Sequence, residues 1–296
     1  MEWALSICNV KQLSQWAGPE QGEKFRPASE DGFPEDVDFT RIYFGQEFCE
    51  RALPKVDEVM QAVMLCNKEN KKFTLVTPYV TEHGLARLKD IFANMEQYHV
   101  HCEVVANDWG VLYLLQEKYS SFVPVLGRLL NKIWRDPRMD SYLRDISPED
   151  RRLFQTCSLA GSFMQSLMKS FGVNRIEMDN LLQGLDENLP QWGYLVSLYV
   201  PYGCITTGRI CFFQSWGLRS EDKFQASPQT CGRQCEGQWL EFRESSLLSG
   251  PGNPKCQVMQ KGNSVFYRQS PAFVKKGLEQ AASLGVSRIV YQPEPL

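Results

Sequence analysis

The chain has 296 residues, of which 43% are hydrophobic and 23% charged, and its formal net charge is −3. This length fits one barrel-sized domain or two small domains, and the composition is that of a globular protein with a large core. The slightly negative charge argues against broad binding to nucleic acid or to anionic membranes. No apolar run approaches the roughly 20 residues of a membrane helix, so we expect no membrane span.

The N-terminal stretch "MEWALSICNVKQLSQW" has no basic segment followed by an apolar one, and it therefore does not resemble a secretory signal. We expect a cytoplasmic protein. Thiols stay reduced in that compartment, so the ten cysteines of the chain are expected to be buried thiols or metal ligands rather than disulfides.

Short apolar runs alternate with amphipathic helical patterns along the chain, which indicates an α/β protein with a parallel sheet. The runs predict strands at 3–9, 39–45, 72–80, 101–108, 122–127, 175–180, 194–203 and 287–292. A further strand is expected at 264–269, either in the same sheet or apart from it. Polar or Gly/Pro-rich segments at 17–38, 214–230 and 245–257 predict loops.

Helical spacing of apolar residues predicts helices at 53–66 and 83–95. A longer helix is expected at 147–172, capped by Ser147, and a last one at 271–285. Eight strands with interleaved helices predict a single-domain TIM-like (β/α) barrel, regular or irregular, over residues 1–296. A cysteine-bearing loop insertion is expected at about 204–260. A doubly wound open sheet is the alternative fold.

The ten cysteines divide into two groups by their surroundings. Cys8, Cys66, Cys102 and Cys157 lie in apolar strands or helices and are expected to act as small core residues, and Cys256 lies in a loop. The others follow predicted strands or lie in polar segments: Cys49, Cys204, Cys211, Cys231 and Cys235.

Four thiolates are the usual ligand set of an iron–sulfur cluster or of structural zinc. In a parallel barrel the carboxyl ends of the strands converge, so Cys49 and Cys211 can meet despite their separation in sequence. Cys231 and Cys235 form a close pair in "CGRQCEG". This spacing is neither that of a ferredoxin nor that of a zinc ribbon. By itself it is compatible with a metal site and equally with thiols that bind no metal.

The segments "RIYFGQEFCERA", "CEVVANDWGVLYLL", "VLGRLLNKIWRDPRM", "EMDN" and "RICFF" with a later Cys-x3-Cys resemble the collagenase-like peptidase family, most strongly its single-domain UbiV/UbiU type. The resemblance covers about residues 39–240. It implies a [4Fe–4S] cluster held by Cys49, Cys211, Cys231 and Cys235. Cys204 has no counterpart in the family pattern and stays an alternative to Cys211, which we favour.

The resemblance also implies a function in oxygen-independent hydroxylation, of a ubiquinone-type small molecule or of an RNA base. It further implies a heterodimer with a related family member. The alternative is a four-cysteine zinc protein that acts as a structural or partner subunit. A hydrolase is the least favoured function. The sequence has neither a G-x-S-x-G elbow nor an HExxH motif, which are typical of serine hydrolases and zinc peptidases.

Polar residues at predicted strand ends are the candidate catalytic groups: Asn107, Asp108, Arg128 and Asp179. Each acidic residue has a second interpretation as a helix cap. Arg128 suits a substrate carboxylate, or else an ion pair with Asp108 or Asp179. The basic segment 127–138, which contains Arg128, is expected to form a solvated helix face rather than an RNA-binding patch.

The three histidines are expected to be solvated. His99 and His101 precede a predicted strand, which places them at the amino end of the barrel, away from the expected site. His83 begins a predicted helix after a strand and is the one histidine placed for acid/base chemistry.

Overall fold

Eight parallel strands close into a barrel in the computed structural model, which describes residues 1–17, 27, 32–34, 36–143, 145–223, 231–242 and 256–295. The predicted TIM-like barrel is confirmed. The strands, in their order around the barrel, are β1 (Glu2–Ile7), β12 (Val286–Tyr291), β7 (Leu195–Val200), β6 (Arg175–Asp179), β5 (Val123–Leu126), β4 (Glu103–Ala106), β3 (Lys72–Thr77) and β2 (Arg41–Gly45).

The strands are buried on both faces because alternate side chains point into the barrel and toward the helices. In β2, Ile42 and Phe44 belong to the large core shared with the helices, whereas Tyr43 lies in the barrel interior. The interior apolar layer consists of Ala4, Tyr43, Val76, Val105, Val125, Tyr199 and Val290.

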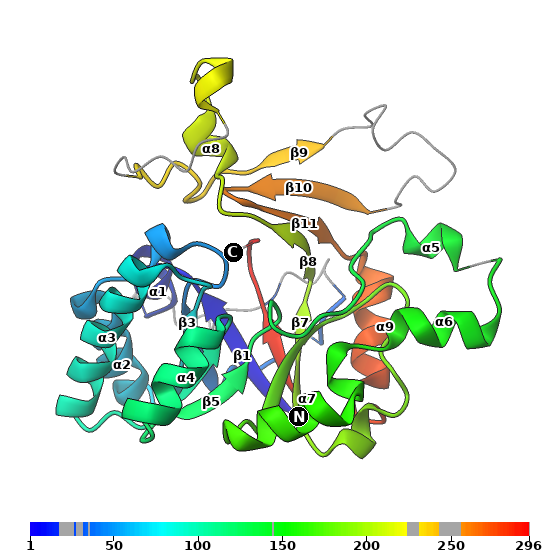
Figure 1. Cartoon of the computed structure of the whole chain (residues 1–296), viewed down its shortest axis with the longest axis horizontal. Coiled ribbons are helices and arrows are strands. Elements are labelled where there is room, and N and C mark those ends of the chain that lie inside the picture. Colours follow the sequence, from blue (N-terminus) through cyan, green and yellow to red (C-terminus); the bar gives the residue numbers. More distant parts are fainter. Residues whose placement is uncertain are drawn as a thin grey trace.

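Helices cover the outside of the barrel, with α1–α4 on one side and α6 and α9 on the other (Figure 1). The predicted amphipathic faces are the buried ones. For example, α2 buries Val59 and Val63 and α3 buries Leu88 and Phe92. The helices are α1 (Val10–Ala17), α2 (Val56–Lys68), α3 (Glu82–Gln97), α4 (Trp109–Lys118), α5 (Met139–Tyr142), α6 (Pro148–Gln155), α7 (Ser162–Ser170), α8 (Phe212–Ser215) and α9 (Pro271–Ala281).

The long helix expected at 147–172 is instead two helices, α6 and α7. Ser147 caps α6 as expected, with its hydroxyl accepting the Asp150 N–H at 3.0 Å. Thr156 and Gly161, both poor helix formers, have an extended backbone conformation and so interrupt the helix. The short 3-10 helix η3 (Ser158–Ala160) lies between them. Cys157, expected on a helix face, lies in this connection and is nevertheless buried.

The strand expected at 194–203 is also divided. β7 ends at Val200, and after Pro201 the chain enters β8 (Tyr202–Thr207). β8 begins an antiparallel sheet with β11 (Ser264–Arg268), β10 (Gln257–Lys261) and β9 (Leu240–Phe242), in that order.

This second sheet lies over the end of the barrel where the strands finish (top of Figure 1). The strand expected at 264–269 is therefore present but apart from the barrel sheet. The insertion expected as a loop at about 204–260 contributes strands to it. Within the three predicted loops, residues 18–26, 28–31, 35, 224–230 and 245–255 lie outside the described residues.

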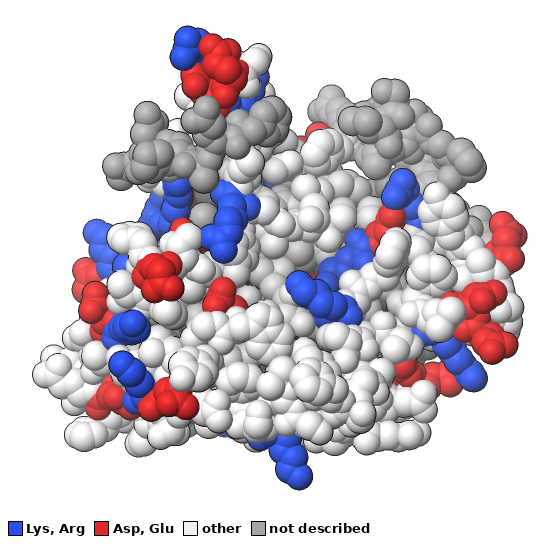
Figure 2. Space-filling model, viewed as in Figure 1, with Lys and Arg blue, Asp and Glu red and all other residues white. Residues whose placement is uncertain are grey.

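Charges of both signs are interspersed over the described part of the face drawn in Figure 2. Among the helices described here, none combines the length and apolar character needed to cross a membrane. At the carboxyl end of the barrel, buried polar residues lie inside it and the second sheet lies above them.

Candidate cysteine site at the carboxyl end of the barrel

Four cysteines from three distant segments line one pocket: Cys49, Cys211, Cys231 and Cys235. They are the four that the family resemblance selects. Cys49 follows β2 and precedes the short helix η2 (Glu50–Ala52), and Cys211 is the residue before α8. Each of the four is a free thiol and partly exposed.

The turn between β10 and β11 brings these segments together. Its Gly262 has a φ of 60°, a left-handed conformation that favours glycine, and a β-carbon there would lie 3.5 Å from the Cys235 Sγ. The Gly262 carbonyl accepts the Phe212 N–H at 3.1 Å, next to Cys211. The Asn263 side chain donates to the carbonyl of Phe48 at 2.8 Å, next to Cys49.

Two arginines tie the cysteine-bearing segments to one another. Arg51, beside Cys49, donates to Gln214 Oε1 at 2.7 Å and so holds α8 against η2. Arg233, between the paired cysteines, donates to the Leu53 carbonyl at 3.1 Å. Both arginines also line the pocket, together with Lys261. The pocket therefore places cations around thiols that become anionic when they bind a metal.

Burial favours the neutral form of two of these thiols, those of Cys49 and Cys235, in the absence of a metal. It raises the pKa of Cys49, and it raises the pKa of Cys235 to about 12, with the neighbouring thiols adding to the effect. The mutual influence of Cys235 with Cys49, Cys211 and Cys231 reflects their proximity. A metal binds the thiolate and displaces the proton, so this donor set fits a thiolate-ligated group.

Within the described residues, no three side chains of His, Cys, Asp or Glu are grouped so as to hold one metal ion. A cluster sets a different requirement, since each of its thiolates binds a different iron atom. The pocket that these thiols line has a volume of about 40 Å³, so receiving a cluster requires its lining to open.

Two further cysteines lie close to this site without sharing its character. Cys8 also lines the pocket, but its thiol is buried and donates to Gln12 Oε1 at 3.2 Å. Cys204, the alternative to Cys211, lies in a buried apolar cluster with Phe48 and Phe266. Burial raises the pKa of Cys204 to about 12, and its thiol does not line the pocket.

A buried ionic network lies below Phe48, inside the barrel. Arg128 is fully buried and binds Glu47 through two hydrogen bonds, from Nε at 2.8 Å and from the second guanidinium nitrogen at 2.5 Å. It also donates to Asp179 Oδ1 at 2.7 Å and stacks 3.8 Å above the centre of the Tyr199 ring. Of the two readings for Arg128, the structure shows the ion pair with Asp179.

Asp179 is held by two cations. Its second oxygen accepts from Arg135 Nε at 2.7 Å, and its first also accepts the Cys204 N–H at 3.1 Å. Burial by itself would raise the pKa of Asp179, but Arg128 and Arg135 lower it below its usual value. Burial would likewise lower the pKa of Arg128, and its two carboxylate partners raise it.

The segment 127–138 does not form the solvated helix that its spacing suggested. Its backbone forms turns at 128–130 and 137–138 with irregular structure between them, and Arg128 and Arg135 pair with the buried Glu47 and Asp179. Sequence reasoning missed Glu47 and Arg135 as members of this network. Glu47 follows the end of β2 by two residues, the same signal that identified Asp108 and Asp179.

The other two candidate catalytic residues bond to backbone groups. Asn107 donates to the Thr77 carbonyl at 3.0 Å and accepts the Leu129 N–H at 3.0 Å. Asp108 caps α4 by accepting the Gly110 N–H at 2.7 Å, and its other oxygen accepts the Val80 N–H at 3.2 Å. The structure therefore brings Arg128 and Asp179 together, while Asn107 and Asp108 hold neighbouring strand ends and loops.

Comparisons with known proteins give structural neighbours only. No protein-family model and no curated protein matches the chain. Among solved structures, it is similar to the U32 peptidase Mk0906, at 10% identity and a TM-score of 0.43, over 100% of this chain and 94% of the other. It is also similar to the spore cortex-lytic enzyme SleL of Bacillus megaterium QM B1551, at 7% identity and a TM-score of 0.36, over 98% and 70% of the two chains. The fold assignment thus rests on the barrel topology itself.

Proposed function

We propose that this chain binds a [4Fe–4S] cluster through Cys49, Cys211, Cys231 and Cys235. The observation that carries the proposal is the shared pocket of four free thiols from segments up to 186 residues apart in sequence. Four thiolates are the standard ligand set of such a cluster. Three cations line the pocket, Arg51, Arg233 and Lys261, and would offset part of the negative charge of the ligands. Arg233 also pairs with Glu236 at 3.2 Å and Lys261 with Glu294 at 3.1 Å.

We further propose that the chain belongs to the collagenase-like peptidase family, in its UbiV/UbiU type, and takes part in oxygen-independent hydroxylation in the cytoplasm. The sequence motifs around Cys49 and Cys211 support this part of the proposal. Its substrate would be a ubiquinone-type small molecule or an RNA base, and its partner a related family member. When bound, the cluster would supply electron transfer or a site for a substrate oxygen.

The alternative function is a zinc-binding structural or partner subunit. The same four thiols would first have to draw together, because among the described residues no three such side chains are grouped around one ion. The two functions differ in the metal and in its light absorption. A cluster gives a brown protein with thiolate-to-iron absorption bands after anaerobic purification, whereas zinc gives a colourless one.

The test is a set of single cysteine substitutions in anaerobically purified protein. Cys231→Ala and Cys235→Ala should each lose most of the iron, because three thiolates hold a cluster poorly. Cys157→Ala is the matched control, since Cys157 is buried in the connection between α6 and α7, and it should keep its iron. Full iron retention in both pocket variants would show that the ligand assignment is wrong.

A further inference from the structure

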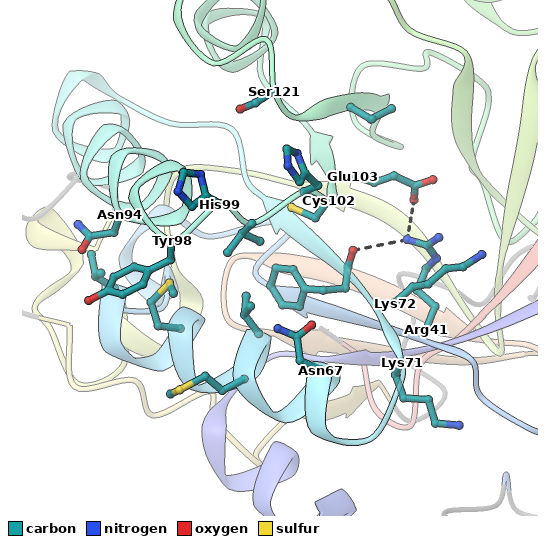
Figure 3. Close-up of a pocket in the computed structure, with 18 of the residues that line it drawn as sticks. Arg41, Asn67, Lys71, Lys72, Asn94, Tyr98, His99, Cys102, Glu103 and Ser121 are labelled. Atoms are coloured by element: carbon teal, nitrogen blue, oxygen red, sulfur yellow. Dashed lines mark hydrogen bonds and ion pairs between the residues drawn. The ribbon is translucent and has the colours of Figure 1, made fainter.

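The largest groove described here lies at the opposite end of the barrel from the cysteines. It has a volume of about 1170 Å³ and runs along α2 to the end of α3, above the beginnings of β3 and β4 (Figure 3). On α2 it is lined from Val56 to Asn67, which corresponds to about three helical turns. We propose that this groove binds an acidic amphipathic helix of a partner protein.

The apolar lining of the groove has the composition of a protein interface. Met60 and Met64 are four residues apart and so lie on the same face of α2. Met64 is 62% exposed and Tyr98, across the groove, is 63% exposed. Methionine adapts to varied surfaces, and both methionine and tyrosine are enriched in interfaces. An elongated groove with such a lining suits a helix that places residues i, i+4 and i+7 in it.

The charge of the groove selects an acidic occupant, although the whole chain is slightly negative. Three lysines line it, Lys55, Lys71 and Lys72, together with His99 and His101. Arg41 also lines it, but it is 7% exposed and pairs with Glu2 and Glu103. In Figure 3, Tyr98 and His99 lie on one side of the groove, and Lys71 and Lys72 on the other. The lysines on one side would lie along an acidic helix and match its charge, and Tyr98 on the other side would pack against its apolar face.

The carboxylates near the groove do not cancel this charge. Glu103 lies within 3.6 Å of three arginines, at positions 41, 175 and 288, and these lower its pKa. Lys71 and Lys72 pair with Asp38 at 3.2 Å and with Glu2 at 3.4 Å. Each pair has one well-exposed partner, Asp38 at 59% and Lys72 at 68%, and such pairs are weak, so Lys72 in particular can turn to a partner at little cost. Asp57 is the remaining acidic residue of the lining.

The test is a selection from a displayed library of random 14-residue peptides on the full-length protein. Peptides that also bind the Met64→Glu variant are removed. We expect the enriched peptides to carry a net negative charge and apolar residues at helical spacing. Enrichment of basic peptides, enrichment without helical spacing, or no enrichment would each overturn the proposal.

The best enriched peptide is then labelled, and its affinity is measured by fluorescence anisotropy. Met64→Glu should weaken binding about tenfold, and Lys71→Glu together with Lys72→Glu should weaken it by at least about threefold and reduce its salt dependence. Phe163→Glu on α7 is the matched control, since Phe163 is 79% exposed and remote in the fold, and it should bind like the wild type.

Two outcomes would assign the groove to another occupant and so overturn the proposal. One is self-association of the chain that Met64→Glu abolishes, which would make a second copy the occupant. The other is equal binding to the Met64→Glu and Phe163→Glu variants. Circular dichroism melting of each variant establishes that it is folded, which is expected because the substituted side chains are exposed.

Discussion

Two clusters of predicted site residues lie at the same end of the barrel and differ in what they bond to. In the ionic network, Arg128 uses its guanidinium on Glu47 and Asp179, and both oxygens of Asp179 accept hydrogen bonds. In the cysteine pocket, the thiols of Cys49, Cys211, Cys231 and Cys235 are free and share one small space. Phe48 lies between the two, packed on Phe266 and 5.5 Å from the Arg128 guanidinium.

Polar residues at the ends of the barrel strands therefore need not form one site. A network whose groups satisfy one another contributes to stability and has little bonding capacity left for a substrate. The gathered thiols form no disulfide and accept weak backbone hydrogen bonds, such as that from the Arg233 N–H to the Cys231 Sγ at 3.4 Å, so they contribute little to stability and keep their capacity for a ligand.

Removing Arg128 should produce the largest loss of stability. Arg128→Met leaves Glu47 and Asp179 buried without their shared cation, so the free energy of unfolding should fall by about 3–5 kcal/mol in urea titration. Cys231→Ala, measured on metal-free protein, should change it by less than about 1 kcal/mol. Comparable losses in the two variants would contradict the division between network and pocket.

The buried carboxyl of Glu177, deeper in the barrel, should make the stability of the protein depend on pH. It is fully buried, accepts from the Tyr43 hydroxyl at 3.0 Å, and its Oε2 has no hydrogen-bond partner among the described residues. Burial raises the pKa of Glu177 from 4.5 to about 7. The folded chain therefore holds this proton more tightly than the unfolded chain, and the resulting stability is full below pH 4.5 and is lost as the pH rises to about 7.

Glu177→Gln isolates this contribution, because the amide does not titrate. Between pH 4.5 and 7 the wild type should lose stability relative to the variant, by at most about 1.4 kcal/mol per pH unit. Urea titrations of both proteins across this range measure the difference. A constant difference across the range would show that Glu177 does not titrate there.

Asp108 separates a capping role from a catalytic one. Asp108→Ala removes the cap of α4 and should lower the free energy of unfolding by about 1 kcal/mol. Asp108→Asn should retain most of it, because asparagine caps equally well. If Asp108 also serves chemistry, the Asn variant will lose activity while keeping stability, and thermal melts beside activity assays of the anaerobic protein distinguish the two cases.

Substitution of Cys204 should have the smallest effect, and it distinguishes the apolar cluster from the cysteine pocket. Its thiol packs with Phe48 and Phe266 outside the pocket lining. Cys204→Ala should therefore cost roughly 1 kcal/mol of stability and leave the iron content unchanged. Cys211→Ala should do the reverse, losing iron with little change in the stability of metal-free protein. Iron loss in the Cys204 variant would reassign the ligand.

The barrel could be predicted from the sequence because its signal is local. Apolar runs such as 72–80 and 101–108 are bounded by helical patterns, and the eight predicted strands correspond to the eight of the barrel. The errors arose where tertiary contacts override local preference. The basic segment 127–138 has helical spacing, yet its arginines pair with the buried Glu47 and Asp179 and its backbone is a mixture of turns and irregular structure.

The second sheet was harder to predict because its strands pair across long or undescribed segments. One local signal was available, the Gly262–Asn263 dipeptide between two strands, which is typical of a β-hairpin turn. That turn brings the cysteine-bearing segments together. The choice of Cys49, Cys211, Cys231 and Cys235 came from the family resemblance, since spacing does not reveal which loops converge.

Metal analysis of the anaerobically purified protein tests whether Cys49, Cys211, Cys231 and Cys235 hold an iron–sulfur cluster. Iron, acid-labile sulfide and zinc are measured per chain, together with the visible absorption spectrum. A [4Fe–4S] cluster predicts about four iron and four sulfide per chain, with thiolate-to-iron absorption bands. About one zinc per chain without iron or sulfide would contradict the account and make the pocket a structural zinc site.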